Sequence, residues 1–142
     1  MQPDWQTMSD RKSATIAKPE AWFHFSLAEG ARDDRPGIYE WRIDGVGCYI
    51  GKYSSISRPK RAYAQIVSRI EKKLAYRKGK PNGFRRIHLA LADAKRAGRR
   101  VEVCILENVE PEKLNACEQA WIKRRRHEEA AGGLPVLNGG SK

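Results

Sequence analysis

The chain has 142 residues, which suits one domain with a workable core. Lys and Arg number 28 against 17 Asp and Glu, so the formal net charge is +11. Such a surplus favours a polyanionic partner, of which nucleic acid is the commonest. Three cysteines do not form a disulfide framework, and no apolar run has the length of a membrane span. We therefore expect a cytoplasmic protein that binds DNA and no membrane.

We divide the chain into an N-terminal arm, residues 1–35, and a folded domain, residues 36–142. The first 18 residues are polar and lack periodicity, so a mobile arm is expected there. Residues 19–30 are predicted as a short helix laid against the domain. They carry Trp22, Phe23, Phe25 and Leu27.

The domain begins with a predicted β-hairpin. The runs GIYEWRI and GCYIGKY are rich in β-prone residues and flank Asp44-Gly45. Ser57 and Pro59 then favour the start of a helix. Its apolar stripe has helical spacing and consists of Tyr63, Ile66, Val67, Ile70 and Leu74.

Three further elements follow. A second helix is predicted from Phe84 to Ala94, stopped by Gly98, and a third strand over residues 101–106. Pro111 begins a third helix, and an irregular tail follows it. The order strand, strand, helix, helix, strand, helix predicts an α/β (α+β) domain with a small three-stranded, mainly antiparallel sheet flanked by helices.

Basic residues gather in two places, around the start of the second helix and within the third. Each group could be a solvated face, but we interpret both as phosphate-contacting surfaces. Such contacts give affinity with little base specificity and a strong salt dependence. The two groups comprise Tyr76, Arg77, Lys78, Lys80, Asn82, Arg85 and Arg86, and Lys123, Arg124, Arg125 and Arg126.

Two tripeptides in the hairpin carry a family resemblance. Gly37-Ile38-Tyr39, followed by Tyr49-Ile50-Gly51, resembles the motif of the GIY-YIG nucleases. Lys52 directly follows, Glu118 lies in E-x-x-W-I like the family's metal-binding glutamate, and Asn138 resembles its C-terminal asparagine. The resemblance covers about residues 36–139. It implies a GIY-YIG-like fold and a DNA endonuclease that hydrolyses phosphodiester bonds with one Mg²⁺, or Mn²⁺, ion.

Glu118 is the sharpest single candidate. It lies four residues after Leu114 and three before Trp121, on the apolar stripe of its own helix. A carboxylate there must be paired, protonated or metal-bound. From the residues alone, an ion pair with an arginine is equally good; the resemblance favours the metal.

The resemblance assigns a tyrosine as general base or water-positioning residue. We favour Tyr39 as the base and Tyr49 as a ligand of phosphate or water, although either could simply pack the sheet. A phenol titrates at about pH 10, so a nearby cation is needed at neutral pH, and Lys52 is the candidate.

The hairpin loop decides whether both tyrosines share a face. A two-residue turn would pair Tyr39 with Ile50 and put Tyr49 on the opposite face. A three-residue loop, residues 44–46, would place Trp41 opposite Tyr49 and restore the shared face. We predict the three-residue loop.

The family also places an arginine and, one turn later, a histidine or tyrosine early in its first helix. The ungapped count puts Tyr63 at the later position and Pro59 at the arginine position, so Arg58 or Arg61 must serve; we favour Arg58. Either would clamp the scissile phosphate, or be a solvated helix-face residue. Tyr63 would support the water or phosphate, or pack the helix.

Two further residues have open interpretations. His88 could touch DNA or assist proton transfer, or be structural. Asn138 could be a conformational or phosphate-side ligand, or a turn residue. The alternative to a nuclease is a catalytically inactive nucleic-acid-binding module. Since the chain has no room for a recognition domain, a homodimer or partner protein would have to add specificity.

Overall fold

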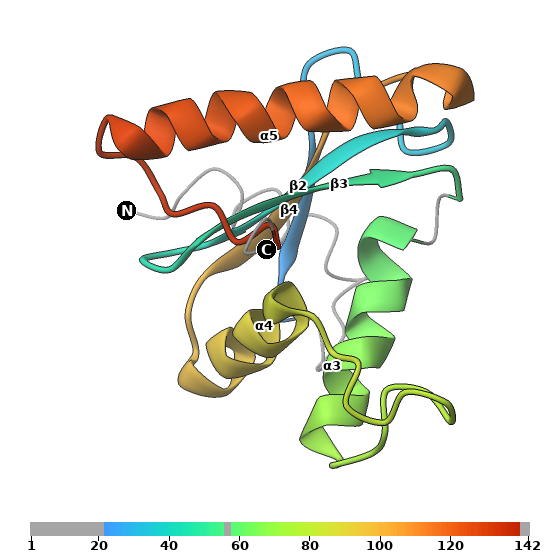
Figure 1. Cartoon of the computed structure of the whole chain (residues 1–142), viewed down its shortest axis with the longest axis vertical. Coiled ribbons are helices and arrows are strands. Elements are labelled where there is room, and N and C mark those ends of the chain that lie inside the picture. Colours follow the sequence, from blue (N-terminus) through green and yellow to red (C-terminus); the bar gives the residue numbers. More distant parts are fainter. Residues whose placement is uncertain (1–21, 56–57, 140–142) are drawn as a thin grey trace, which may run out of the picture.

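The computed structural model describes residues 22–55 and 58–139 (Figure 1). Within them a mixed four-stranded sheet has the order β1-β4-β2-β3. Strand β2 is antiparallel to both β3 and β4, whereas β1 runs parallel to β4. The strands are β1 (His24–Leu27), β2 (Gly37–Ile43), β3 (Gly47–Tyr53) and β4 (Val101–Asn108).

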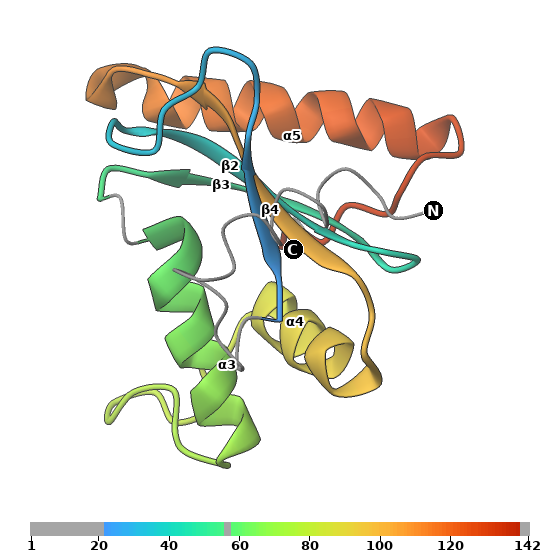
Figure 2. The same cartoon turned by 180° about the vertical axis from the view of Figure 1, so that it is seen from behind.

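Helices cover both faces of the sheet. Helix α5 (Leu114–Ala130) crosses one face, and α3 (Tyr63–Glu71) and α4 (Arg86–Ala97) cover the other (Figures 1 and 2). A π-helical turn, η1 (Arg58–Ala62), precedes α3, and a 3₁₀ turn, η2 (Pro111–Lys113), precedes α5. No helix in the described part of the chain is both long and apolar enough to cross a membrane.

The predicted mixture of strands and helices is confirmed, but the prediction of a three-stranded sheet is wrong. The predicted short helix at residues 19–30 is also wrong where it is described, because His24–Leu27 forms β1. Phe23 and Phe25 alternate with polar neighbours and pack on the core, which is the period of a strand. Pairing with β4 covers an edge that would otherwise be open. The polar residues 1–18 and Ser57 lie outside the described residues.

The predicted hairpin register is confirmed. Trp41 lies opposite Tyr49, and Tyr39 lies opposite Gly51. The loop has three residues, with Gly45 at a φ of 75° and the Val46 N–H donating to the Ile43 carbonyl at 2.9 Å. Tyr39 and Tyr49 therefore share one face of the sheet.

The alternation of the strands builds two cores. On the side of α3 and α4, Tyr39, Trp41 and Tyr49 join a large cluster with Val67 and Leu91. On the side of α5, a smaller cluster comprises Ile38, Ile50, Leu114, Leu106, Val109, Cys117, Trp121 and Ile122. The predicted apolar stripe of the first helix holds except at Leu74, which lies beyond the end of α3 and is exposed. Gly98 caps α4 in the left-handed conformation, as predicted.

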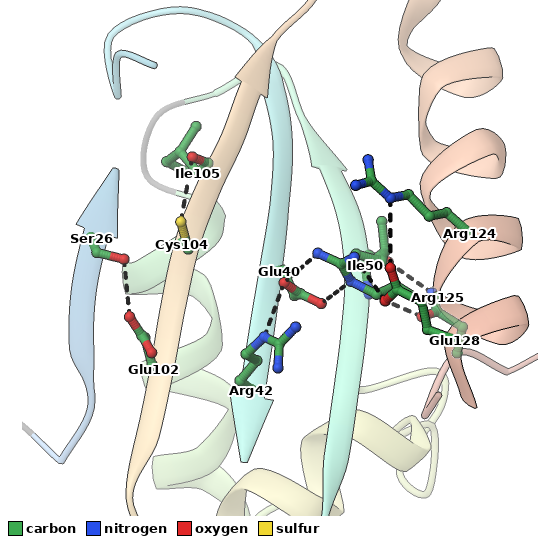
Figure 3. Close-up of polar contacts among 11 residues, drawn as sticks. Ser26, Glu40, Arg42, Ile50, Glu102, Cys104, Ile105, Arg124, Arg125 and Glu128 are labelled. Carbon is green, nitrogen blue, oxygen red and sulfur yellow. Dashed lines mark hydrogen bonds and ion pairs between the residues drawn. The ribbon is translucent and has the colours of Figure 1, made fainter. Parts of the chain in front are cut away.

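A buried ion pair fastens α5 to the sheet. Glu40 on β2 is 3% exposed and accepts hydrogen bonds from Arg125 at 2.7 and 3.2 Å (Figure 3). Arg42 and Glu128 extend the cluster at the surface. Hydrogen bonding to Glu40 raises the pKa of Arg125 above its usual value. Arg125 is therefore held against the sheet, unlike its exposed neighbours in the run predicted to contact phosphate.

The C-terminal segment closes the edge of β3. The Cys48 N–H donates to the Pro135 carbonyl at 2.8 Å, and the Leu137 N–H donates to the Cys48 carbonyl at 2.7 Å. The Asn138 side chain continues the pattern: its Oδ1 accepts from the Ile50 N–H at 2.9 Å and its Nδ2 donates to the Ile50 carbonyl at 2.7 Å. The side-chain amide thus replaces one residue of a neighbouring strand.

Candidate functional site

A cleft of about 430 Å³ opens beside the second half of β3. Because β3 is an edge strand, the cleft reaches side chains from both faces of the sheet. It is lined by Tyr39, Tyr49, Gly51, Lys52, Tyr53, Ser54, Ser55, Arg85, Leu114 and Glu118. The two motif tyrosines, the lysine and the glutamate predicted from the sequence are thus brought to one place.

Gly51 allows Tyr39 to reach this cleft. A Cβ atom at Gly51 would overlap the ring and hydroxyl of Tyr39, which cross the strand at that point. The Tyr39 hydroxyl lies 2.6 Å from the hydroxyl of Tyr63, a hydrogen bond in which either can be the donor. Tyr63 itself is buried at the start of α3. It therefore both packs the helix and fixes the orientation of the Tyr39 hydroxyl.

Glu118 meets Lys52 at the α5 side of the cleft. Lys52 Nζ donates to Glu118 Oε1 at 3.2 Å. The Glu118 side chain is 14% exposed, whereas that of Lys52 is 42% exposed. The partner of Glu118 is thus a solvent-exposed lysine and not the arginine that the sequence analysis considered.

The strand register places Lys52 on the opposite face of the sheet from the tyrosines beside which it was predicted to lie. Lys52 alternates with Gly51 and Tyr53, so its side chain leaves the opposite face of β3 from Tyr39 and Tyr49. Its ammonium lies at the cleft, but beside a carboxylate.

Arg85 contributes a second cation to the cleft, from the N-cap of α4. Desolvation acts to lower the pKa of Arg85, but Tyr49, and to a smaller extent Tyr63 and Tyr76, raise it above its usual value. Arg85 and Tyr49 share the lining of the cleft. The sequence predicted Arg85 as a surface contact to DNA and did not place it beside a motif tyrosine.

The structure does not place Arg58 or Arg61, the two arginines predicted at the start of the first helix, on the described lining of the cleft. Arg58 begins η1, and its side chain lies outside the description. Arg61 is exposed on η1 and does not line the cleft. Of the described side chains, the arginine on the cleft lining is Arg85, and the predicted role of Arg58 lies outside the described residues.

His88 is buried behind the cleft, at 4% exposure. Its Nδ1 accepts a hydrogen bond from the Arg85 backbone N–H at 2.9 Å. Its ring packs between those of Tyr63 and Tyr76, with centroids 5.5 and 5.8 Å away. The ring is therefore not part of the surface predicted to contact DNA, and the structural interpretation describes it better.

Asn138 does not line the cleft, and its amide is held by the Ile50 backbone at the edge of β3. These two hydrogen bonds fit the conformational interpretation, and the chain bends at Asn138 and Gly139, as the turn interpretation also expected. The remaining predicted basic contacts are exposed: Arg77, Lys78, Lys80, Arg86, Lys123, Arg124 and Arg126.

The sequence reasoning missed several lining residues, namely Tyr53, Ser54, Ser55 and Leu114. The signal available for the serines was their position directly after the second strand, where the chain leaves the sheet beside the motif glycine. Tyr53 donates to the Arg32 carbonyl at 3.3 Å, and burial raises its pKa, so it forms a neutral wall.

The described residues contain no group of three or more His, Cys, Asp or Glu that could hold a metal ion. The cleft offers one carboxylate, that of Glu118, with the hydroxyls of Ser54 and Ser55 on the same lining. A site of this kind resembles the loosely held magnesium sites in which water and substrate phosphate supply most ligands.

Comparisons of the chain with protein-family models, curated proteins and solved structures found no match. The resemblance to the GIY-YIG nucleases thus stands on the motif residues alone.

Proposed function

We propose that this cleft hydrolyses DNA phosphodiester bonds with the help of one divalent metal ion. The observation that carries the proposal is that the Glu118 carboxylate and the Tyr39 and Tyr49 phenols line one cleft, although they come from opposite faces of the sheet. A nuclease of the predicted kind needs these groups around a single phosphate.

Glu118 would hold Mg²⁺, or Mn²⁺, with water and phosphate oxygens completing the shell. When bound, the ion would polarise the phosphate and stabilise the leaving oxygen. The fit is supported by the Lys52 ammonium beside Glu118, since a cation is already accommodated there. Because Lys52 is well exposed, its side chain is free to exchange the carboxylate for a substrate phosphate.

The chain's own residues divide the remaining work. Tyr39 holds the attacking water through its hydroxyl, and Tyr63 keeps that hydroxyl in one orientation. Once Glu118 holds the metal ion, Lys52 neutralises negative charge on the phosphate. Exposed lysines and arginines on the α4 and α5 sides of the molecule would hold the flanking backbone with little sequence preference.

The test uses purified wild type and Glu118→Ala with supercoiled plasmid and with branched DNA, in Mg²⁺ or in chelator. We expect Mg²⁺-dependent nicking that the chelator and the substitution each abolish. Equal product from wild type and variant would overturn the proposal. The comparison of the two DNA substrates also reports whether the enzyme prefers junctions or flaps.

One observation favours a binding module without catalysis as the second candidate. The ion pair between Lys52 and Glu118 gives this carboxylate a structural partner that needs no metal. Such a module would bind DNA with a strong salt dependence, nick nothing, and bind equally well after Glu118→Ala.

A further inference from the structure

The charges that line the cleft do not cancel. Its lining carries Lys52, Arg85 and Glu118, and the first and last of these neutralise each other at 3.2 Å. No carboxylate of the described residues forms an ion pair with Arg85. The lining is therefore left with one positive charge, located on a guanidinium. A phosphodiester linkage carries one negative charge, so the two are complementary.

The backbone of Arg85 is fixed before any ligand arrives. Its N–H donates to the buried Nδ1 of His88, which lies three residues later in α4. The His88 ring is in turn packed between Tyr63 and Tyr76. This anchoring fixes the point of the backbone from which the Arg85 side chain projects, so the backbone there loses little freedom when a ligand binds.

Tyr49 shares the cleft lining with Arg85. It is 8% exposed on β3, so its ring is fixed in the core beside the cleft. A guanidinium carries five N–H donors, so a neighbouring phenol leaves donors for a ligand in the cleft.

We propose that Arg85, from the N-cap of α4, grips the phosphodiester in the cleft, in the place for which the resemblance predicts an arginine of the first helix. The inference rests on the proposed function for the reaction, but the anion site follows from the lining itself. The forked donors of arginine match two phosphate oxygens, whereas a lysine would offer one point of charge.

The test compares Arg85→Ala and Arg85→Lys with Arg86→Ala, an exposed arginine one residue later that does not line the cleft. Circular dichroism first establishes that each variant is folded. We expect Arg85→Ala to lower single-turnover plasmid nicking by about 100-fold or more, the cost of losing one phosphate-stabilising donor. Arg85→Lys should recover part of this rate. Arg86→Ala should leave the rate intact and weaken only salt-sensitive binding.

A second readout does not depend on turnover. The thymidine dinucleotide TpT, which has one phosphodiester and no terminal phosphate, is titrated into ¹⁵N-labelled wild type. We expect the Nε–Hε signal of Arg85 to shift with saturation and that of Arg86 to stay in place.

The outcomes separate the two proposals. Nicking by Arg85→Ala at the rate of Arg86→Ala would overturn the role of Arg85 and leave the nuclease proposal standing. Wild type that never nicks DNA, but whose Arg85 signal shifts with TpT, would overturn the nuclease and keep the anion site. An unmoved Arg85 signal would remove the anion site.

Discussion

Asn138 provides the sharpest stability prediction, because its side chain replaces a strand at the edge of the sheet. The substitution Asn138→Ala removes two hydrogen bonds at once, to the N–H and to the carbonyl of Ile50. Ile50 is fully buried, and both of its backbone groups would lose their partners in the protein.

The magnitude follows from those two groups. A buried polar group left without a partner costs about 1–3 kcal/mol, so two cost roughly 2–6 kcal/mol. Because the tail lies at a sheet edge where water can partly replace it, we expect a loss of about 3 kcal/mol in the free energy of unfolding. At ~2–4 °C per kcal/mol this corresponds to a Tm lower by roughly 6–12 °C.

Urea unfolding followed by tryptophan fluorescence measures this loss. The control is Asn82→Ala, an asparagine exposed in the loop before α4, for which a change within about 0.5 kcal/mol is expected. If Asn138→Ala is as stable as this control, the reasoning is refuted. Any nuclease activity of Asn138→Ala should return on cooling, since the residue lies outside the cleft lining.

Two further substitutions test the path of Tyr39 and the anchoring of α5. Gly51→Ala places a methyl group where the Tyr39 ring crosses β3, so we expect a loss of about 1–3 kcal/mol and a strong drop in nicking as the hydroxyl is displaced. Glu40→Gln removes the carboxylate that holds the largely buried Arg125, and a loss of about 3–5 kcal/mol is expected from urea unfolding.

Each of these has a matched control. Gly79→Ala adds the same methyl group in open space and should change neither stability nor activity. Glu128→Gln removes a half-exposed carboxylate from the same ion cluster and should cost less than about 1 kcal/mol. Stability losses in the controls equal to those of Gly51→Ala and Glu40→Gln would contradict the assigned packing.

The hairpin itself was predictable from local rules, namely the alternation in the two runs and the turn residues between them. Its three-residue loop was selected by the resemblance, which needs Tyr39 and Tyr49 on one face, and the register is as predicted. The strand His24–Leu27 was missed because it is only four residues long, and its pairing with β4 joins residues 78 positions apart in the sequence. A pattern that short suits a helix or a strand equally well.

The sequence predicted several residues of the cleft lining, but it did not predict which of them contact one another. The motif identified Tyr39, Tyr49, Lys52 and Glu118, all of which line the cleft. That Lys52 pairs with a residue 66 positions away depends on how α5 crosses the sheet, which local sequence does not encode. Arg85 reaches the cleft for the same kind of reason, since packing of α4 brings its N-cap to the same lining as Tyr49.

The central claim is that the Glu118 carboxylate serves cleavage and not merely DNA binding or folding. The direct measurement is single-turnover cleavage of labelled duplex DNA in Mg²⁺ by Glu118→Gln, with the DNA affinity measured on the same preparation. Glu112→Gln, an exposed residue of η2, is the matched control. We predict that Glu118→Gln binds DNA as well as wild type but cleaves it at least ~100-fold more slowly. Cleavage by Glu118→Gln at the control rate would contradict the account.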